Sequence, residues 1–302
     1  MKKTILEKFY KLKSPKIEKV SGGLNKKTSL VKTSDRITVV KWYALETEAL
    51  KEAEAAKFFL DLTPQPILNI NQSPITRAND KLLILWEHIP GVSVSGQIKE
   101  SLAVDLAKKL SKYHLKNKEF LDAIPAKDDY VTENTNLDSK TKQELDNSNK
   151  KIKSIDGFSE MRKTVIHSDL TRQNVFVNSG KTKVLSFIDL GDCHIDFITW
   201  DLAVLITHIF ISKTYGVELK PLSAFLNEYK KNVKLSDVEK KSIIPFMIIR
   251  NIKLIKETSD LLTQRKEKED IEELNSINNS VTEKIQLIKN ALVELEFLLS
   301  SL

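Results

Sequence analysis

Apolar and polar residues alternate along the first part of the chain in the manner of β-strands. The runs 28–33 and 37–43 are rich in Val, Ile and Thr and flank a short turn, a pattern typical of a hairpin. A further strongly apolar run, 81–89, ends in a Pro-Gly dipeptide, which marks a turn. We therefore predict a small antiparallel sheet over 16–43 and a separate strand at 81–89.

The later part of the chain follows the helical period instead. Apolar residues recur three and four positions apart and form one-sided stripes, as in amphipathic helices. Ser236 and Glu239 form a capping box before an apolar run, and Pro245 within that run predicts a kink or a restart. The predicted helices cover 46–60, 97–120, 139–155, 199–211, a segment from 234 onward, and 269–302.

One stretch in this helical part, 165–189, returns to the strand pattern. Two β-rich runs, 175–177 and 184–188, flank an Asn-Ser-Gly turn, so we predict a hairpin. The hairpin places Asn174, before the first strand, beside Asp189, after the second, and Asp169 lies five residues before Asn174. Two carboxylates and an amide supply oxygen ligands, which suit a hard cation such as Mg²⁺ and the phosphates it carries.

The motifs in this hairpin are HSDLTRQN and FIDLGD, with WDLA just downstream. Their spacing resembles the kinase catalytic loop H-x-D-x-x-x-x-N followed by a metal-binding Asp. The sequence is identified as similar to the aminoglycoside phosphotransferase and choline kinase superfamily, homoserine kinase-like members included. A polar hairpin loop capped by Asp and Asn is the alternative. A single HxD would favour that alternative, but the full set of motifs favours the kinase-like site.

The resemblance implies a role for each polar residue of the hairpin. Asp169 accepts the proton of the substrate hydroxyl, and Asn174 and Asp189 hold Mg²⁺. His167 orients the loop through hydrogen bonds. Asp201, in the WDLA motif, either caps the helix that follows or braces the catalytic loop.

A Gly-Gly pair near the N-terminus is the next motif of interest. Ser21, Gly22 and Gly23 begin the sequence SGGLNKK, which resembles the phosphate loop of the same family. Glycine lets backbone amides approach phosphate oxygens without a Cβ in the way. An ordinary hairpin turn is the alternative, and the position of the pair, one hairpin before a strand lysine, favours the nucleotide loop.

That strand lysine is Lys41, which follows four strand residues as the nucleotide-binding lysine does in V-A-I-K-type strands. One glutamate of the helix 46–60 should pair with it and aim its ammonium at the phosphates. Counting back from the P-x-P motif of the family points to Glu52, which borders the apolar face of the helix. Glu48 is the second candidate.

The strand 81–89 resembles the hinge of the family, where main-chain groups bind the adenine edge. The resemblance implies that Leu85 lies behind the base and that residues from Glu87 to Ile89 supply the backbone contacts. We interpret Trp86 as a core or surface tryptophan in preference to a stacking partner of the base.

The acceptor is not specified by any motif. The family implies an aminoglycoside, choline or ethanolamine, homoserine or hydroxylysine, or a sugar-like alcohol. Asp192 and Asp196 follow Asp189 on a predicted loop that faces the cleft, and carboxylates there would attract an ammonium group. We therefore expect a small cationic or zwitterionic alcohol; the alternative is that Asp192 is only a cap and Asp196 is solvated.

Composition narrows the range of partners. The 48 Lys and Arg residues against 41 Asp and Glu give a net charge of +7. Because the lysines are spread among glutamates and form no dense block with aromatics, we expect no nucleic-acid partner. Cys193 is the only cysteine, which fits a reducing cytoplasm. The charged N-terminus is unlike a signal peptide, and no run is apolar enough to cross a membrane.

These interpretations combine into one expectation. The fold is α+β, protein-kinase-like and two-lobed, with a small antiparallel-sheet lobe at 1–90 that binds nucleotide. A larger, mainly helical lobe at 91–302 contains the catalytic hairpin 165–192 and the substrate-side helices. The predicted enzyme is an ATP-dependent phosphotransferase that uses Mg²⁺ and acts on a hydroxyl of a small molecule. The alternative is a pseudokinase or nucleotide-binding module without transferase activity.

Overall fold

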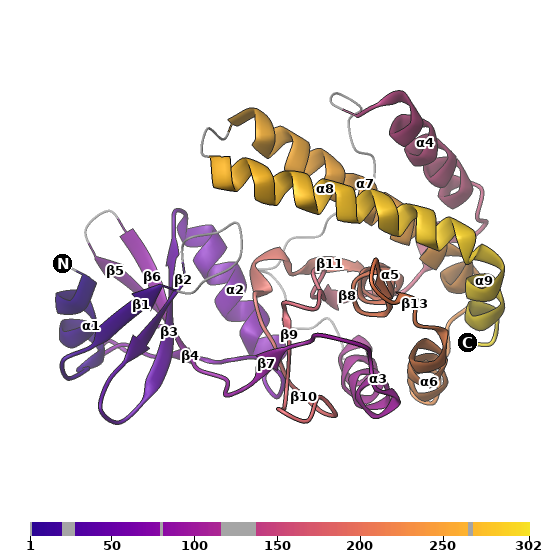
Figure 1. Ribbon diagram of the computed structural model, residues 1–302. Coiled ribbons are helices and arrows are strands. Elements are labelled where there is room, and N and C mark those ends of the chain that lie inside the picture. Colours follow the sequence, from indigo (N-terminus) through magenta and orange to yellow (C-terminus); the bar gives the residue numbers. More distant parts are fainter. Residues whose placement is uncertain (1, 20–27, 79–80, 116–136, 265–267) are drawn as a thin grey trace.

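The computed structural model describes residues 2–19, 28–78, 81–115, 137–264 and 268–302 of the chain. The predicted phosphate loop, Ser21 to Gly23, lies outside these ranges. The structure has a sheet-rich part at the N-terminal end and a larger, mainly helical part, joined by an extended segment (Figure 1).

The N-terminal part is built on one antiparallel sheet. Its strands pair in the order β1-β2-β3-β6-β4, and β5 also pairs with β6. Lys41 of β3 lies opposite Ile84 of β6, and Val40 lies opposite Leu85. The strands are β1 (Lys16–Lys19), β2 (Thr28–Lys32), β3 (Ile37–Tyr43), β4 (Pro66–Ile67), β5 (Ile75–Ala78) and β6 (Lys81–Glu87).

The two faces of this sheet are covered by different helices. One face packs with α1 (Lys2–Tyr10), whose Leu6 and Tyr10 join Val40 and Leu85 in a small separate core. The other face carries Tyr43 and Ile84 into the main core together with α2 (Glu46–Phe58). Because side chains alternate along a strand, Lys41 points to the α2 face and its neighbours in sequence to the α1 face.

The second part is a helical body with short sheets inserted. β7 (Val92–Ser93), β9 (Val175–Val177) and β10 (Val184–Phe187) form one of them, and β8 (Lys163–Ile166) pairs with β11 (His194–Phe197). β12 (Ile211–Ser212) pairs with β13 (Gly216–Val217). The helices are α3 (Glu100–His114), α4 (Ser139–Lys153), α5 (Ile198–Leu205), α6 (Leu219–Tyr229), α7 (Asp237–Gln264), α8 (Lys268–Asn290) and α9 (Leu292–Ser300).

Helices α7 and α8 form a long antiparallel pair that extends over the body toward the N-terminal part (Figure 1). α7 begins with the predicted capping box: Ser236 N–H donates to Glu239 at 2.8 Å, and Glu239 N–H donates to the Ser236 hydroxyl at 3.3 Å. The helix continues through Pro245. Phe246, Met247, Ile249 and Ile252, which follow Pro245, are fully buried.

The predicted α+β, two-lobed fold is confirmed, and several elements differ in detail. The sequence pattern did not predict α1. The predicted helix 199–211 ends as an α-helix at Leu205 and continues as one π-helical turn, Ile206–Phe210. The division of the chain at residue 90 stays a prediction. In the described part of the chain, no helix is long and apolar enough to span a membrane.

Candidate active site

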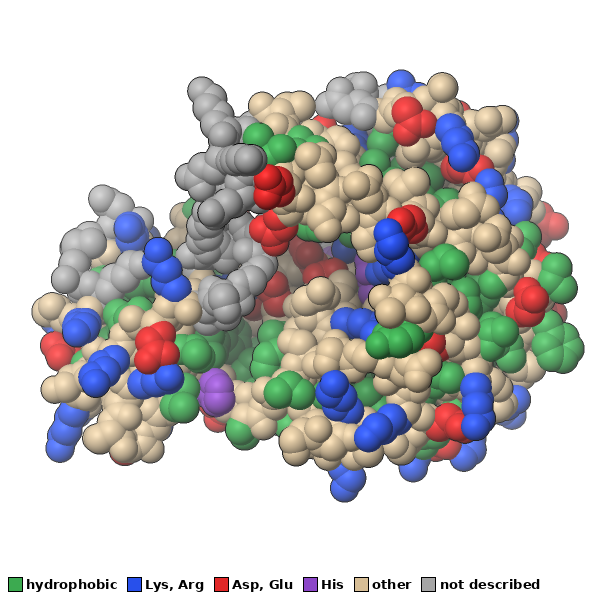
Figure 2. All heavy atoms as spheres, viewed as in Figure 1, with side chains coloured by type: hydrophobic (Ala, Val, Ile, Leu, Met, Phe, Trp, Pro, Cys, Tyr) green, Lys and Arg blue, Asp and Glu red, His purple; other side chains and the backbone are tan. Residues whose placement is uncertain are grey.

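The catalytic hairpin brings its polar residues together through strand pairing. β9 and β10 are antiparallel neighbours, and the Ile188 N–H donates to the Asn174 carbonyl at 2.9 Å. Asn174 uses its side-chain amide nitrogen to bind Asp169, at 2.7 Å to the carboxylate and 3.0 Å to the backbone oxygen. The amide oxygen of Asn174 is thereby directed away from Asp169. Acidic side chains are visible in the hollow between the two lobes (Figure 2).

Asp201 of α5 holds the loop that carries Asp169. The fully buried Asp201 carboxylate accepts hydrogen bonds from the backbone N–H groups of Ser168 at 2.7 Å and His167 at 3.0 Å. Burial would raise the pKa of Asp201, but the hydrogen bond from His114 and the nearby histidines lower it below its ordinary value. Of the two predicted roles for Asp201, the structure therefore has the brace, since no side chain caps α5.

His167 ties the same loop to the hairpin. Its Nε2 lies 3.0 Å from the Ile188 carbonyl, and its Nδ1 accepts the Asp169 N–H at 3.3 Å. An imidazole that accepts at Nδ1 and faces a carbonyl at Nε2 carries its proton on Nε2. The buried ring therefore fixes the start of the loop relative to the end of β10, as a residue that orients the loop should.

Lys41 connects the two lobes at the hairpin. Its ammonium lies 2.8 Å from Glu52 of α2 and 2.7 Å from Asp189. Glu52 is buried and also accepts a hydrogen bond from the Tyr43 hydroxyl at 2.9 Å. Burial opposes the charge on Lys41, yet the two carboxylates raise its pKa above the ordinary value. Glu52 and not Glu48 is thus the glutamate that pairs with Lys41.

Asp189 has an unusual backbone conformation. Its φ of +63° is in the left-handed region, which a non-glycine residue adopts at a cost and mostly at functional sites. Although burial opposes ionisation, Lys41 lowers the pKa of Asp189 below its ordinary value. The ionised carboxylate is about half exposed, with 52% of the side chain accessible.

The donor set at this point fits a magnesium ion that is shared with phosphates. No group of three or more His, Cys, Asp or Glu side chains in the described ranges could hold a metal alone. Asp189 and the amide oxygen of Asn174 are two hard oxygen donors, and Mg²⁺ in nucleotide sites is commonly bound by one or two protein groups plus phosphates and water. These residues could therefore hold Mg²⁺ together with a nucleotide.

The second carboxylate, Asp169, has a partner that sequence reasoning missed. Arg250 of α7 donates to the Asp169 carboxylate at 3.0 Å. Burial raises the pKa of Asp169 above its ordinary value in spite of this arginine, and Asp192 and Asp189 add to the rise. A carboxylate with a raised pKa accepts a proton more readily. The sequence signal was an arginine within the apolar run FMIIRNIKLI.

Comparison with known proteins identifies the family. The model of the "Phosphotransferase enzyme family" matches residues 16–225, more than half of the chain. The chain belongs to the phosphotransferase enzyme family. The predicted superfamily is thereby confirmed, as is the predicted class of enzyme, a phosphotransferase with an alcohol group as acceptor. No curated protein matches the chain in sequence.

Solved structures of the phosphotransferase fold are similar over nearly the whole chain. A microcompartment-associated aminopropanol kinase has a TM-score of 0.70 at 13% identity, covering 98% of each chain. An amicoumacin kinase, solved with AMP-PNP, Ca²⁺ and Ami, has a TM-score of 0.68 at 14% identity, covering 94% of this chain and 92% of that one. Choline kinase LicA from Streptococcus pneumoniae has a TM-score of 0.66 at 16% identity, covering 95% of this chain and 99% of that one. They establish a protein-kinase-like fold.

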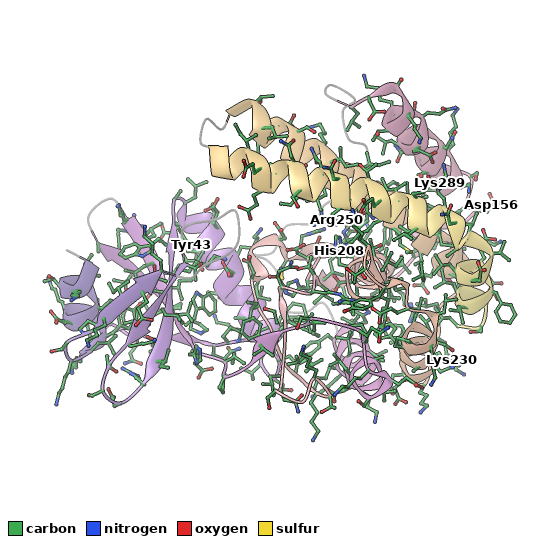
Figure 3. All side chains as sticks on the ribbon, viewed as in Figure 1. Tyr43, Asp156, His208, Lys230, Arg250 and Lys289 are labelled. Atoms are coloured by element: carbon green, nitrogen blue, oxygen red, sulfur yellow. The ribbon has the colours of Figure 1, made fainter. Side chains whose placement is uncertain are left out.

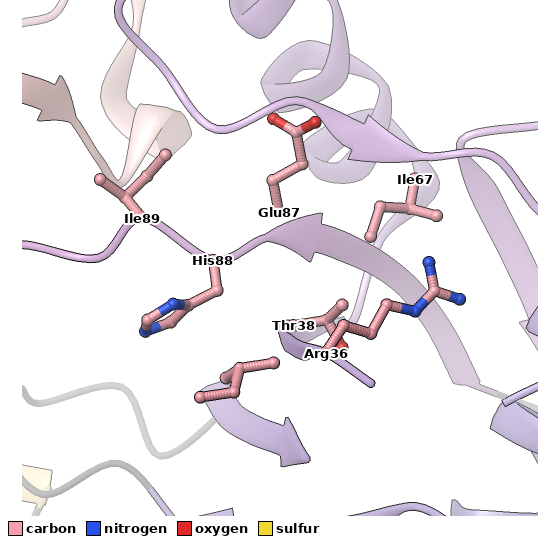
Figure 4. Close-up of a pocket in the computed structure, with 7 residues that line it drawn as sticks. Arg36, Thr38, Ile67, Glu87, His88 and Ile89 are labelled. Atoms are coloured by element: carbon pink, nitrogen blue, oxygen red, sulfur yellow. The ribbon is translucent and has the colours of Figure 1, made fainter. Parts of the chain in front are cut away.

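The predicted hinge of this phosphotransferase borders a cavity of about 370 Å³ (Figure 4). Glu87 and His88 point to opposite sides of the strand end there. The Glu87 N–H is donated to the Gln65 carbonyl at 3.0 Å, so it is engaged within the protein, and the backbone contacts predicted at Ile89 stay a prediction. The cavity is lined by Arg36, Ile37, Thr38, Ile67, Glu87, His88 and Ile89.

The structure contradicts the predicted place of Leu85. This side chain is fully buried in the small core under α1. Lys41 points to the other face of the sheet, so the Leu85 side chain cannot contact a nucleotide held by that lysine. The prediction failed because a continuous apolar run does not reveal which strand residues face which side. Trp86 is a buried core residue, as interpreted from the sequence.

The two aspartates that were predicted to bind the acceptor, Asp192 and Asp196, lie in different environments. Asp192 is exposed, and its charge acts on Asp169, so it lies near the catalytic loop. Asp196 is neither on a loop nor solvated: it lies in β11, is 1% exposed, and its carboxylate binds His194 at 3.1 Å and the Phe197 N–H at 2.7 Å. The predicted role of Asp196 in substrate binding is wrong because pairing of β11 with β8 buries it.

Proposed function

We propose that this protein transfers the terminal phosphoryl group of ATP to a hydroxyl of a small molecule, with Asp169 as the base. The observation that carries the proposal is the joint placement of Lys41, Asp169 and Asp189. Lys41 lies 2.7 Å from Asp189. Asp169 is bound by Asn174, which precedes β9 at the point where the antiparallel β10 ends before Asp189. Phosphoryl transfer depends mainly on such positioning and on charge neutralisation.

The protein residues divide the work between nucleotide and acceptor. Lys41, aimed by Glu52, binds phosphate oxygens, and the predicted phosphate-loop residues Ser21, Gly22 and Gly23 bind the same phosphates. Asn174 and Asp189 hold Mg²⁺, which when bound neutralises charge on the phosphates. The backbone near Ile89 contacts the adenine.

Asp169 acts on the acceptor side of the phosphates. It orients the acceptor hydroxyl and takes its proton as the bond to phosphorus forms. Its raised pKa suits that role. Asp192, exposed close by, contacts the acceptor from the rim of the site.

A nucleotide-binding module without transfer is the competing function. It requires a defect in the catalytic set, and the described residues contain no such defect: Lys41 is paired, and Asp169 and Asp189 are both present, in contact with Asn174 and Lys41 respectively. A nucleic-acid partner has no support beyond the net charge of +7.

The test is an ADP-release assay with Mg·ATP and a panel of small alcohols. The panel contains choline, ethanolamine, 3-aminopropan-1-ol, homoserine, hydroxylysine, an aminoglycoside and glycerol. We expect at least one alcohol to stimulate ADP release and to appear phosphorylated by mass spectrometry, and Asp169→Asn to lower both signals by roughly 10²-fold or more. Binding of Mg·ATP without transfer to any alcohol in a broad panel would instead establish the nucleotide-binding module.

A further inference from the structure

A cluster of basic side chains begins at the partner of Asp169. Arg250 of α7 contacts the Asp169 carboxylate at 3.0 Å. Lys284 of α8 lies with its ammonium 3.1 Å from Nδ1 of His208, in the π-helical turn after α5. Arg250 acts electrostatically on both of these residues. In Figure 3, Arg250 and His208 lie under the α7 and α8 pair, toward the centre of the molecule.

Lys284 is a largely buried cation without a counter-ion in the described part of the chain. Its one polar contact among the described residues is with the neutral ring of His208. Burial, together with the positive charges of Arg172 and Arg250, lowers the pKa of Lys284 to about 8. A buried charge is costly unless an opposite charge accompanies it. Such a residue is a common feature of sites that bind an opposite charge.

His208 presents a second buried donor. Burial first, and then Lys284 and Arg250, lower the pKa of His208 well below its ordinary value, so the ring is neutral. Because the Lys284 ammonium donates to Nδ1, the ring proton is on Nε2. This Nε2 is buried and has no hydrogen-bond partner among the described residues. The ring is held in a π-helical turn, a feature frequent at functional sites.

The neighbouring Arg172 is a useful comparison, because it is a cation with partners inside the protein. Its guanidinium binds Glu218 at 2.8 Å and the carbonyls of Ile209 and Gly96 at 2.6 Å each. Its positive charge is therefore compensated by groups of the protein itself. Arg250, by contrast, shares its charge with the proposed base, and its other nitrogen is 3.9 Å from Glu257, beyond hydrogen-bond distance.

We propose that Arg250, Lys284 and His208 bind an anionic group, a carboxylate or a phosphate, on the acceptor whose hydroxyl is phosphorylated. This proposal rests on the proposed function. The three side chains offer only donors, two of them charged, and charge-assisted hydrogen bonds to an anion would satisfy them. Since Arg250 touches Asp169, the anionic group lies within a few bonds of the reacting hydroxyl, and the acceptor is small.

The cluster changes the expected charge of the acceptor. The sequence predicted a cationic or zwitterionic alcohol on the strength of two aspartates, one of which, Asp196, is buried and paired. A purely cationic alcohol would meet Arg250 and Lys284 with like charge. A hydroxy acid is complementary to them, and an ammonium on the same molecule could still face Asp192.

The first experiment compares alcohols that differ only in the anionic group. Serine is paired with ethanolamine, homoserine with 3-aminopropan-1-ol, glycerate with ethylene glycol, and glycerol 3-phosphate with glycerol. We expect the anionic member to have the higher kcat/KM in the pair that reacts. The glycerate and glycerol 3-phosphate arms separate a carboxylate site from a phosphate site. A consistent preference for the uncharged or cationic members would overturn the proposal.

Two variants test whether a preference for the anionic alcohol arises from the cluster. Lys284→Met should reduce the ratio of anionic to uncharged kcat/KM by about 10- to 100-fold, the range for loss of a hydrogen bond to a charged group, and leave KM for ATP unchanged. Arg250→Lys keeps the charge but loses the planar fork and should reduce the ratio less. Lys289→Met, an exposed lysine of α8 paired with Glu144, is the matched control and should leave the ratio unaltered.

The second experiment does not need turnover, so it separates this proposal from the proposed function. With Mg·ADP bound, the thermal unfolding midpoint is measured in malonate, inorganic phosphate or chloride at equal ionic strength. We expect malonate or phosphate to raise the midpoint of the wild type and of Lys289→Met, but not of Lys284→Met. If neither anion raises the wild-type midpoint above chloride, the anion site is refuted even if transfer occurs. If one does and no alcohol is phosphorylated, the site stands and the transferase proposal fails.

Discussion

The carboxylate of Asp201 lies 2.7 Å from the backbone nitrogen of Ser168, a residue whose φ is +66°. A serine in the left-handed region costs of order 1–3 kcal/mol unless its surroundings hold it there. Asp201 supplies that hold, with a second hydrogen bond to His167 N–H. The direction in which Asp169 leaves the loop therefore depends on a buried carboxylate on α5.

The first prediction concerns this brace. Asp201→Asn replaces an acceptor-only group by one that must present an N–H to one of its neighbours. We expect the free energy of unfolding to fall by about 2–4 kcal/mol, because a buried network of charge-assisted hydrogen bonds is broken. We also expect kcat to fall while the protein stays folded. Urea unfolding and steady-state kinetics measure the two effects.

The control for that variant is Asp237→Asn, at an exposed carboxylate in the first turn of α7. A surface substitution of this kind should change the free energy of unfolding by less than about 0.5 kcal/mol. Equal stability of Asp201→Asn and wild type would show that Asp201 does not hold the loop.

The second prediction tests Asp169 as the base. Asp169→Asn should lower kcat by roughly 10²-fold or more, the range expected for loss of a general base. Affinity for Mg·ATP should stay nearly intact, since Lys41 and Asp189 are untouched. Isothermal titration gives the affinity and ADP release gives the rate. Loss of nucleotide binding with an unchanged rate per bound ATP would make Asp169 a ligand or a brace.

The third prediction tests Asp189. Asp189→Ala removes both the carboxylate that would hold Mg²⁺ and the partner 2.7 Å from Lys41. We expect turnover to be abolished and Mg·ATP binding to weaken, with the protein folded by circular dichroism. Titration of Mg²⁺ at fixed ATP should show a higher apparent requirement for the metal. Near-normal transfer in this variant would refute the assignment of the metal site.

The fourth prediction concerns the aim of Lys41. Glu52→Gln removes the charge of a buried carboxylate that lies 2.8 Å from the Lys41 ammonium. We expect KM for ATP to rise about 10-fold or more, since a charge-assisted hydrogen bond of about 1.5–3 kcal/mol is lost. Glu48→Gln, at an exposed position one turn earlier on α2, should leave KM unchanged. Similar effects of the two variants would show that Glu52 does not position the lysine.

The parts of this site that could be predicted are those in which the spacing of residues along the sequence fixes the distance between their side chains. Asn174 and Asp189 could be placed together because a hairpin joins them, and the family spacing placed Asp169 with them. The pairing of Lys41 with Glu52 followed from the spacing to the P-x-P motif of the family. In each case, local geometry or a motif with known spacing links the residues.

Other features depended on tertiary packing that no local pattern encodes. The fate of Asp196 was set by pairing of β11 with β8, two strands far apart in the sequence. The side on which Leu85 is buried was set by α1, which covers one face of the sheet. Arg250 reaches Asp169 across 81 positions of sequence, and only the packing of α7 on α5 brings them together.

The last prediction concerns the stability cost of the largely buried Lys284. The pKa of Lys284 is lowered from 10.5 to about 8. Between these values the unfolded chain binds more protons than the folded protein, so the free energy of unfolding rises as pH increases from about 8 to about 10.5. Below pH 8 the full cost of the buried charge is present. A shift of this size corresponds to at most about 3.5 kcal/mol.

Urea unfolding of the wild type and Lys284→Met at several pH values checks this. Other lysines and tyrosines titrate in the same range, but they do so in both proteins and cancel in the difference. We expect Lys284→Met to be the more stable protein at pH 7, by up to about 3.5 kcal/mol, and its advantage to disappear toward pH 10.5. Saturating malonate or phosphate should stabilise the charged lysine, raise its pKa and reduce the advantage at pH 7. If Lys284→Met were less stable than wild type at pH 7, the prediction would be wrong. The packing contacts of the lysine side chain would then contribute more to stability than its uncompensated charge costs.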